Sequence, residues 1–285
     1  MDDTPRSIAV GAATITVVNV GDIKFNLGKM LKVPESDREI SQHIESLHRS
    51  ESFPSQSVHI ALADASIVVD PGDYTAFADT PFAQPEYQPP PDLLAQLQMR
   101  AILPEDVTHV VITHAHFDHY SAITIERDGK MMPIFPNARY FLQRADWENP
   151  ELQQELQNPD SQDSRTLGVL HKLGLLELVD GRNELVPGLQ LIHAPGESPG
   201  HQIVRVHSQG QTLYCLGDLY HATVEAEHPT WMAGWNNRET MVRSRHALAE
   251  AALPENALLI AAHIPTVGCL ESTASGVRWK PIELT

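Results

Sequence analysis

The segment Thr113-His114-Ala115-His116-Phe117-Asp118-His119 places four metal-binding side chains within six residues. The residues from Val107 to Thr113 (VTHVVIT) are mostly β-branched, which predicts a buried strand that ends where these ligands begin. Side chains two positions apart point the same way in extended backbone, so the first two histidines can bind one ion while the following Asp-His pair turns toward a second. One histidine alone is more often structural than a ligand, but this spacing of four ligands predicts a metal site.

The composition limits the class of protein. The chain has 285 residues, is 42% hydrophobic and carries a net charge of −17, and it contains no run rich in lysine and arginine. It is long enough to bury a large core, as one big domain or two ordinary ones. The acidic balance argues against nucleic acid as a partner, because binding to a phosphate backbone needs clustered cations. The two cysteines, Cys215 and Cys269, provide neither a disulfide framework nor a Cys-rich metal site.

The start of the chain bears on localisation. Residues Met1-Asp2-Asp3-Thr4-Pro5 are acidic where a secretory signal is basic, and no apolar run of 18 residues occurs. We therefore expect a cytoplasmic protein that works on a small molecule, without membrane or nucleic-acid partners.

Apolar runs predict strands that are separated by helices. Residues 8–20 indicate one or two opening strands, and residues 58–69 indicate the next. Asp92 is expected to cap one helix, and Asn236 or Asn237 a longer one. Strands that alternate with helices indicate an α/β architecture.

Irregular segments interrupt this pattern. Residues 23–57 are interpreted as an insertion that forms a lid or a homodimer contact, in which Ser36 and Glu39 have the spacing of a capping box before a short amphipathic helix. A surface helix without such a role fits equally well. Residues 73–91 are rich in proline, which predicts a long surface loop. The candidates for an apolar pocket wall are aromatic residues of these segments and of residues 219–236, namely Phe25, Phe53, Tyr74, Phe82, Trp231 and Trp235.

Three later segments repeat the pattern of a strand that leads into a ligand. Predicted strands end before His201, at Asp218 and at His263. Side chains at the ends of strands commonly form the active sites of α/β proteins. Tyr220 and His221, which follow Asp218 closely, are candidates for substrate contact.

The ordered series HxHxDH, His, Asp, His, with VVDPGD at residues 68–73, resembles the metallo-β-lactamase superfamily over roughly residues 15–280. The resemblance implies an α/β fold, a four-layer αβ/βα sandwich of two mixed sheets flanked by helices, as a single domain over residues 1–285. It also implies that Asp70 accepts a hydrogen bond from a ligand histidine and so supports it. The implied ligands are His114, His116 and His201 for one ion and Asp118, His119 and His263 for the other, with Asp218 bridging the two.

The resemblance further implies a chemistry. Two divalent ions that share a water lower its pKa toward about 7 and so supply a hydroxide nucleophile. The expected protein is a binuclear metal-dependent hydrolase that uses a metal-bridging hydroxide, with Asp118 passing a proton to the leaving group. Imidazole and carboxylate ligands favour zinc, and iron, manganese or cobalt also suit them.

Departures from the patterns of the superfamily indicate which of its branches the chain resembles. Asp218 separates the chain from most true β-lactamases, and Glu197 stands where lactonases and glyoxalase II often have histidine. Residues 135–148 (FPNARYFLQRADWE) and the closing GVRWKPIEL resemble the branch of methyl parathion hydrolase and acyl-homoserine lactone lactonases. This branch implies a lactone, a carboxyl ester or an organophosphate as substrate. The alternatives are a glyoxalase II-like thioester hydrolase and a metal-binding or sensing protein without turnover.

Overall fold

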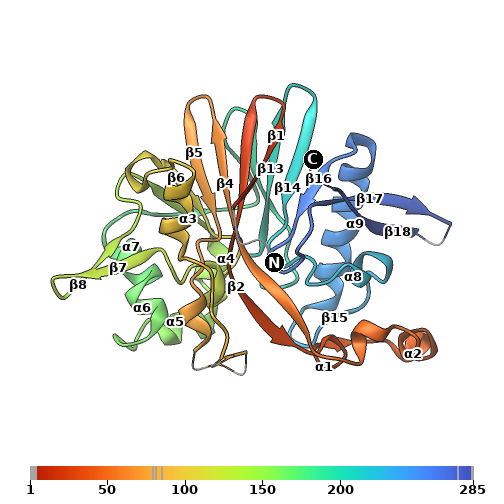
Figure 1. Ribbon diagram of the computed structural model, residues 1–285. Helices are drawn as coiled ribbons and strands as arrows, with labels where there is room; N and C mark the ends of the chain where they lie inside the picture. Colours follow the sequence, from red (N-terminus) through yellow and green to blue (C-terminus); the bar gives the residue numbers. More distant parts are fainter. Residues whose placement is uncertain (1–4, 79, 81, 85, 275, 284–285) are drawn as a thin grey trace.

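Figure 1 shows the computed structural model, which describes residues 5–78, 80, 82–84, 86–274 and 276–283. Two sheets face each other in the middle of the molecule, and helices lie on both outer sides. The acidic start of the chain that informs the expected localisation lies outside the described residues, apart from Pro5. In the described part of the chain, no helix is both long enough and apolar enough to cross a membrane.

Within the described residues, each large sheet has seven strands. The first sheet consists, in spatial order, of β1 (Arg6–Val10), β2 (Ala13–Phe25), β4 (Glu51–Leu62), β5 (Ala65–Val69), β6 (His109–Val111), β9 (Arg139–Gln143) and β10 (Leu176–Val179). The second consists of β11 (Arg182–Val186), β12 (Leu189–His193), β13 (Gln202–Ser208), β14 (Gln211–Cys215), β16 (Leu258–Ile260), β17 (Gly268–Thr273) and β18 (Gly276–Pro281). Both sheets are mixed, because β5, β6, β9 and β10 run parallel in the first, and β14 and β16 do so in the second.

Smaller elements surround the sheets. Two short two-stranded sheets pair β3 (Leu31–Lys32) with β15 (Met232–Ala233) and β7 (Thr124–Arg127) with β8 (Lys130–Pro133). The helices are α1 (Leu27–Met30), α2 (Arg38–Gln42), α3 (Leu93–Met99), α4 (Arg144–Trp147), α5 (Pro150–Glu155), α6 (Gln162–Arg165), α7 (Leu167–Lys172), α8 (Val224–Glu227) and α9 (Arg238–Glu255).

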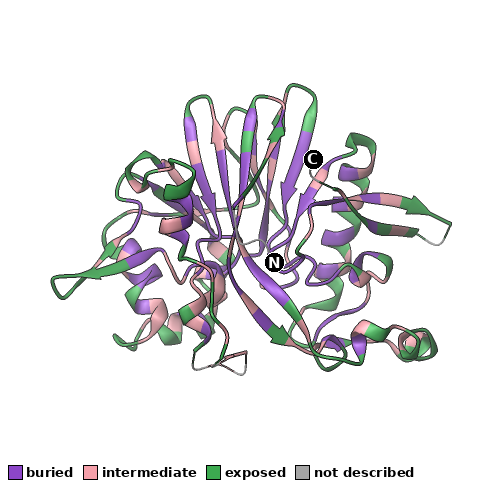
Figure 2. Ribbon diagram, in the orientation of Figure 1, coloured by how far each residue is buried: buried purple, intermediate pink, exposed green. Residues whose placement is uncertain are grey.

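The core between the sheets is made of branched aliphatic side chains. Ile15, Ile60 and Ile67 from the first sheet pack against Leu191 and Val204 from the second, and all five are buried. Figure 2 shows this burial concentrated along the middle of the strands, while the hairpin tips are exposed. The inward-facing side chains of both sheets are thus removed from water together, which is the main favourable contribution to folding.

Helices bury the outer face of each sheet. Leu93 and Leu97 of α3 pack on the first sheet, and Met241 and Leu248 of α9 pack on the second. The expected caps are confirmed. The Asp92 carboxylate accepts from the backbone N–H of Ala95 at 2.8 Å, and the Asn237 side chain accepts from that of Thr240 at 3.2 Å.

The structure corrects two details of the expected strands. Residues 58–69 were expected to form one strand, but they divide between β4 and β5, whose register pairs Leu62 with Ala65. A two-residue turn at Ala63-Asp64 therefore makes a hairpin, because the apolar run continues on both sides of a turn too short to interrupt it. The segment outside the sheet is also shorter than residues 23–57, since β2 and β4 remain paired as far as Phe25 and Glu51.

Residues 26–50 leave the sheet between β2 and β4, and this excursion does not form the expected amphipathic helix. It forms α1, β3, α2 and two short 3₁₀ turns, and Asp37 rather than Ser36 precedes α2. The expected capping box is absent because the Ser36 hydroxyl donates to the Asp37 carboxylate at 2.8 Å. Asp37 in turn accepts from the indole N–H of Trp231 at 2.8 Å. The segment is therefore fastened to residues 231–233, beside the chain that follows Asp218.

His59 in β4 makes the stability of the fold depend on pH. Its Nε2 lies 2.8 Å from the Ser66 hydroxyl, and its buried Nδ1 has no hydrogen-bond partner among the described residues. Burial lowers the pKa of His59 from 6.5 to about 4. Between pH 6.5 and about 4, the unfolded chain therefore binds a proton at His59 that the folded chain does not. The contribution of neutral His59 to the free energy of unfolding is complete above pH 6.5 and is lost as the pH falls to about 4.

We expect the metal-free protein to lose about 2–3 kcal/mol more of its free energy of unfolding between pH 7 and pH 4.5 than the His59→Gln variant does. Urea denaturation at a series of pH values measures this difference. His246→Gln, which changes an exposed histidine of α9, is the matched control and should follow the unsubstituted protein. Parallel curves for the unsubstituted protein and His59→Gln would contradict the assignment.

Candidate metal centre

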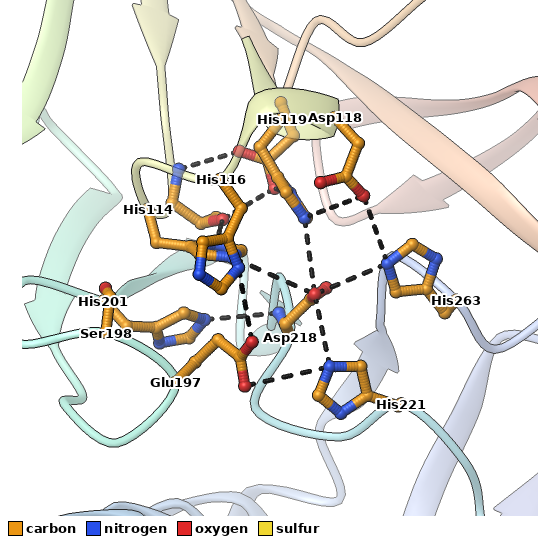
Figure 3. A network of polar contacts seen from close by, with 12 residues as sticks. His114, His116, Asp118, His119, Glu197, Ser198, His201, Asp218, His221 and His263 are labelled. Carbon is orange, nitrogen blue, oxygen red and sulfur yellow. Dashed lines mark hydrogen bonds and ion pairs between the residues drawn. The ribbon is translucent and has the colours of Figure 1, made fainter. Parts of the chain in front are cut away.

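Two pairs of parallel strands bring the ligands to one edge of the sandwich. Strands β5 and β6 are parallel neighbours in the first sheet, as β14 and β16 are in the second. The carboxyl ends of parallel neighbours lie at the same edge of a sheet. His114 follows β6, Asp218 follows β14 and His263 follows β16, and Figure 3 shows these side chains meeting between the two halves.

Hydrogen bonds join the two sheets at this edge. The backbone N–H of Gln202, the first residue of β13, donates to the carbonyl oxygen of Thr113 at 2.8 Å. The Gln202 side chain donates to the carbonyl oxygen of Ile112 at 2.9 Å. The chain before His114 in the first half is therefore fixed against the chain after His201 in the second.

Asp146 in α4 strengthens the same junction. Its buried carboxylate accepts from the backbone N–H of Ala115 at 2.8 Å, from the Ser198 hydroxyl at 2.8 Å and from the backbone N–H of Gly200 at 2.6 Å. One acidic side chain thus holds both the His114–His116 loop and the turn that carries His201. No sequence motif predicts this role, because Asp146 lies outside the ligand motifs.

The carboxylate of Asp218 lies at the centre of the site (Figure 3). Its Oδ2 is 3.4 Å from Nε2 of His119, 3.4 Å from Nε2 of His263 and 3.9 Å from Nε2 of His114. These histidines come from both predicted ligand sets. A single carboxylate therefore faces both metal positions, which is the arrangement expected of a bridging ligand.

One predicted ligand set comes together as expected. Ligand atoms of Asp118, His119 and His263 lie within 4.8 Å of one another. The Asp118 Oδ2 is 3.4 Å from Nε2 of each histidine. Donor atoms about 2.0–2.2 Å from a common zinc ion are no farther apart than about 4.4 Å, so this spacing suits a single ion.

The other set differs from the expectation in one member. Ligand atoms of His114, His116, Glu197 and Asp218 lie within 4.8 Å of one another, and this group does not include His201. Nε2 of His114 is 2.9 Å from Nδ1 of His116. His201 is buried beside the group, with its ring centroid 5.2 Å from that of His114. In the sequence Glu197 stands out only as a departure from relatives, although it lies in the same Pro-Gly turn as His201.

Hydrogen bonds on the far side of the rings orient the histidines. The Nδ1 atom of His119 is 2.9 Å from the Asp70 carboxylate, and that of His263 is 2.8 Å from the carbonyl oxygen of Pro54. The Nδ1 atom of His114 is 3.1 Å from the Thr113 hydroxyl. Each contact leaves Nε2 directed into the site, as metal-binding histidines require.

Asp70 contacts His119, the histidine whose position it would support according to the resemblance. Besides contacting His119, its carboxylate accepts from the backbone N–H of Thr113 at 2.7 Å and from the Thr113 hydroxyl at 2.8 Å. Asp70 has φ +51°, a left-handed conformation that aspartate tolerates better than most residues. Gly217 (φ +50°) approaches Thr113 from the other sheet so closely that a Cβ atom would lie 2.5 Å from its hydroxyl oxygen.

The charges and unpaired polar atoms of the site favour the binding of cations. Burial opposes protonation of His119, but the Asp118, Asp218 and Asp70 carboxylates outweigh it and raise the pKa of His119 well above its usual value. Conversely, His263, His119 and His221 outweigh the effect of burial and hold the pKa of Asp218 well below its usual range. Nε2 of His119 and Oδ1 of Asp218 are buried without a hydrogen-bond partner among the described residues. Divalent ions would supply the missing partners for both atoms, so the residues present fit a two-metal centre.

A pocket of about 410 Å³ opens above the ligands. Its floor includes His116, Asp118, Asp218 and His263. Its walls are largely apolar and include Ile23, Phe25, Met30, Phe77, Phe82 and Phe117. This volume suits a small organic molecule.

The aromatic candidates from the sequence divide into three groups. Phe25, Phe82 and Trp235 line the pocket, and Phe53 stacks on Phe25 with ring centroids 4.1 Å apart. Trp231 is fully buried and Tyr74 partly buried in the same apolar cluster, and neither belongs to the pocket lining found among the described residues. Only the fold decides which of these rings reaches the ligands.

The two candidates for substrate contact face different surroundings. His221 lines the pocket, and its Nε2 is 3.3 Å from Oδ2 of Asp218. Tyr220 is buried on the other side of the chain, where its ring packs beneath the Arg245 guanidinium and beside Trp279. Tyr220 does not belong to the pocket lining found among the described residues.

The fold and the ligand series define the class of protein. The model of the metallo-β-lactamase superfamily matches residues 53–263, and the chain belongs to that superfamily. The family and the sandwich of two mixed sheets flanked by helices, both expected from the sequence, are thereby confirmed.

Individual relatives resemble the chain more distantly. An N-acyl homoserine lactonase of Bacillus cereus is 27% identical over 161 residues, which are 56% of this chain and 57% of the relative. The match thus spans little more than half of that relative's length. Among solved structures, the hydrolase AbOPH gives a TM-score of 0.79 at 16% identity over 100% of this chain and 99% of that one. AidC, a dizinc quorum-quenching lactonase solved with a product, gives 0.77 at 20% identity over 100% of both chains.

We expect Asp146→Ala to lower the free energy of unfolding by about 3 kcal/mol, because three donors lose a charged acceptor. Urea denaturation of the metal-free protein measures this loss. Glu148→Ala removes an exposed acid two residues away and should change stability by about 0.5 kcal/mol or less. Equal stabilities for the two variants would show that Asp146 does not hold the two halves together.

Proposed function

We propose that this protein is a binuclear metal-dependent hydrolase that cleaves a lactone, a carboxyl ester or an organophosphate. The observation that carries the proposal is the pair of His-carboxylate groups around Asp218 at the floor of an apolar pocket. The match to N-acyl homoserine lactonases supports a lactone with an apolar acyl chain as the first substrate class to test. We propose zinc as the native metal, because imidazole and carboxylate donors suit it.

Divalent ions at the two positions would supply a hydroxide nucleophile at neutral pH and would polarise the oxygen of the bond under attack. In this proposal His114, His116 and His201 would hold one ion and Asp118, His119 and His263 the other, with the Asp218 carboxylate facing both positions. The apolar walls exclude water from the ring or acyl group of the substrate. A substrate bound against these walls therefore presents its polar end to the ligands.

Asp118 is placed to handle the proton that the leaving group requires. Its carboxylate borders the pocket, and its Oδ2 contacts Nε2 of both His119 and His263. Such a carboxylate can take a proton from the attacking water and hold it at the face where the leaving oxygen departs. We propose this as its catalytic role, in addition to metal binding.

The excursion over residues 26–50 contributes to substrate binding in this proposal. Met30 of α1 lines the pocket, and Leu27, Leu31 and Leu47 pack in the same apolar cluster as Phe77. This placement supports a pocket wall or lid more directly than a homodimer contact.

The proposal is tested by assaying the metal-loaded protein against a panel of an acyl-homoserine lactone, an aryl ester, a phosphotriester and S-lactoylglutathione. We expect hydrolysis of at least one of the first three, loss of activity after chelation, and recovery on adding Zn²⁺. Asp118→Ala should lower kcat/KM at least about 100-fold, because it removes a ligand and the proton acceptor.

Turnover of the thioester alone would favour the glyoxalase II-like alternative. A fully loaded protein without any turnover would favour metal binding or sensing. Full activity in Asp118→Ala would refute the proposed site.

The two residues that follow Asp218 should differ in their effect on catalysis. We expect His221→Gln to lower kcat/KM at least about tenfold, because its ring borders the pocket and contacts Asp218. Tyr220→Phe should stay within about twofold, since it keeps the ring that packs against Arg245. Steady-state kinetics on the best substrate, with metal content measured for each variant, decides the comparison. The reverse order of effects would contradict the placement of these side chains.

A further inference from the structure

A buried ion pair outside the metal centre holds the chain that follows Asp218. The Arg245 guanidinium of α9 donates to Oε1 of Glu225 in α8 at 2.6 Å, and both side chains are fully shielded from solvent. Figure 1 shows α8 and α9 on the same side of the molecule. Neither side chain lines the pocket found above the ligands among the described residues. Any influence of the pair on a substrate must therefore pass through another residue.

Arg245 binds the backbone of residues 219–231, the segment that leads away from the metal centre. Its Nε donates to the carbonyl oxygen of Leu219 at 2.9 Å, and its Nη1 donates to those of Pro229 at 3.1 Å and Trp231 at 2.6 Å. A guanidinium presents its donors in a rigid, planar fork. These bonds therefore fix the shape of the segment from its first residue to its last.

The second oxygen of Glu225 binds the backbone at His221. Its Oε2 accepts from the backbone N–H of His221 at 2.6 Å and from that of Ala222 at 2.9 Å. The side chain before them, Tyr220, lies against the Arg245 guanidinium, whose Cζ is 4.9 Å from the centre of the ring. The chain is thus held on both sides of His221, and the ring of His221 is left to face the pocket.

The ring of His221 occupies a defined place beside the proposed ligands (Figure 3). Its Nε2 is 3.3 Å from Oδ2 of Asp218, and its ring lies parallel to that of His263 with centroids 6.0 Å apart. Its Nδ1 is 3.8 Å from Oε2 of Glu225, which is beyond hydrogen-bonding distance. The carboxylate therefore directs this ring through the backbone and not through the ring nitrogen.

We propose that Glu225 and Arg245 are positioning residues, which hold the backbone around His221 so that its ring faces a substrate in the pocket. The inference rests on the proposed function, because that function gives His221 a substrate to contact. A buried ion pair adds little net stability, since the cost of removing two charges from water offsets their attraction. Its contribution lies instead in the fixed direction of its hydrogen bonds. A displacement of about 1 Å at a reacting site can lower a rate about 100-fold.

The variant Glu225→Gln keeps the shape of the side chain but cannot serve both of its partners. If the amide oxygen faces the backbone N–H groups, the amide nitrogen faces the donors of Arg245, and the reverse orientation sets donor against donor at the backbone. Glu227→Gln removes an exposed acid of the same helix and is the matched control. Arg243→Met, which changes an exposed arginine of α9, is the control for Arg245→Met.

Circular dichroism and the melting temperature of each metal-free protein establish that it is folded. Glu225→Asp keeps the negative charge beside Arg245 but is one methylene too short to reach both partners. It takes the place of Glu225→Gln in every measurement if Glu225→Gln does not fold.

Steady-state kinetics on the best substrate of the panel, with metal content measured for each variant, separate positioning from a general loss of structure. We expect Glu225→Gln and Arg245→Met each to lower kcat/KM at least about tenfold, and the loss to fall in the same constant, kcat or KM, as in His221→Gln. In the His221→Gln background the same changes should lower kcat/KM by no more than about twofold, because no imidazole remains to be positioned. Both control variants should stay within about twofold in either background.

Equal losses in the two backgrounds would overturn the inference, because a purely structural effect does not depend on His221. Unchanged kinetics in Glu225→Gln would overturn it as well.

Crystal structures of the zinc-loaded proteins test the positioning without turnover. We expect the ring of His221 to withdraw from Asp218 by more than about 1 Å in Glu225→Gln and to keep its place in Glu227→Gln. A ring that keeps its place in both variants would overturn the inference whether or not the protein hydrolyses a substrate of the panel. A displaced ring in a protein that hydrolyses none of them would refute the proposed function and still support the positioning of His221 by Glu225.

Discussion

The arrangement of the site depends on the hydrogen bonds that join the two sheets at one edge. Gln202 binds the carbonyl oxygens of Thr113 and Ile112, and the Asp146 carboxylate binds donors from both halves. Apolar packing between sheets is not directional, so by itself it tolerates small sliding motions. Hydrogen bonds at fixed positions remove that freedom. They place ligands that are more than a hundred residues apart in the sequence within a few ångströms of one another.

The same edge concentrates buried negative charge. The buried Asp70, Glu197 and Asp218 and the partly buried Asp118 surround a small volume, and histidines lie among them. Such a cluster destabilises a protein unless cations compensate it. The fold can maintain the cluster because most of the apolar core lies elsewhere, between the two sheets and beneath the helices on their outer faces. Metal binding should therefore contribute to stability as well as to chemistry.

The parts of the structure that could be predicted from sequence are those encoded locally. The end of β6, the HxHxDH segment and the caps at Asp92 and Asn237 each follow from neighbouring residues. The hairpin within residues 58–69 could not be read, because nothing interrupts the apolar run except the turn itself. The proximity of Glu197 to His116 depends on how a turn folds against another loop, and so does the contrast between Trp231 and Trp235. Contacts of this kind arise from tertiary packing, which a single sequence does not display.

The proposed metal ligands and much of the pocket wall come from different kinds of structure. Most of the ligands follow strands in the interior of the sheets, whereas Met30, Phe82 and Trp235 come from segments outside the two large sheets. Loops tolerate substitution better than the elements they connect. The wall can therefore change through single substitutions while the metal ligands and their supporting hydrogen bonds remain intact. This separation provides a physical route by which one catalytic centre could acquire new substrates during evolution without passing through an inactive intermediate.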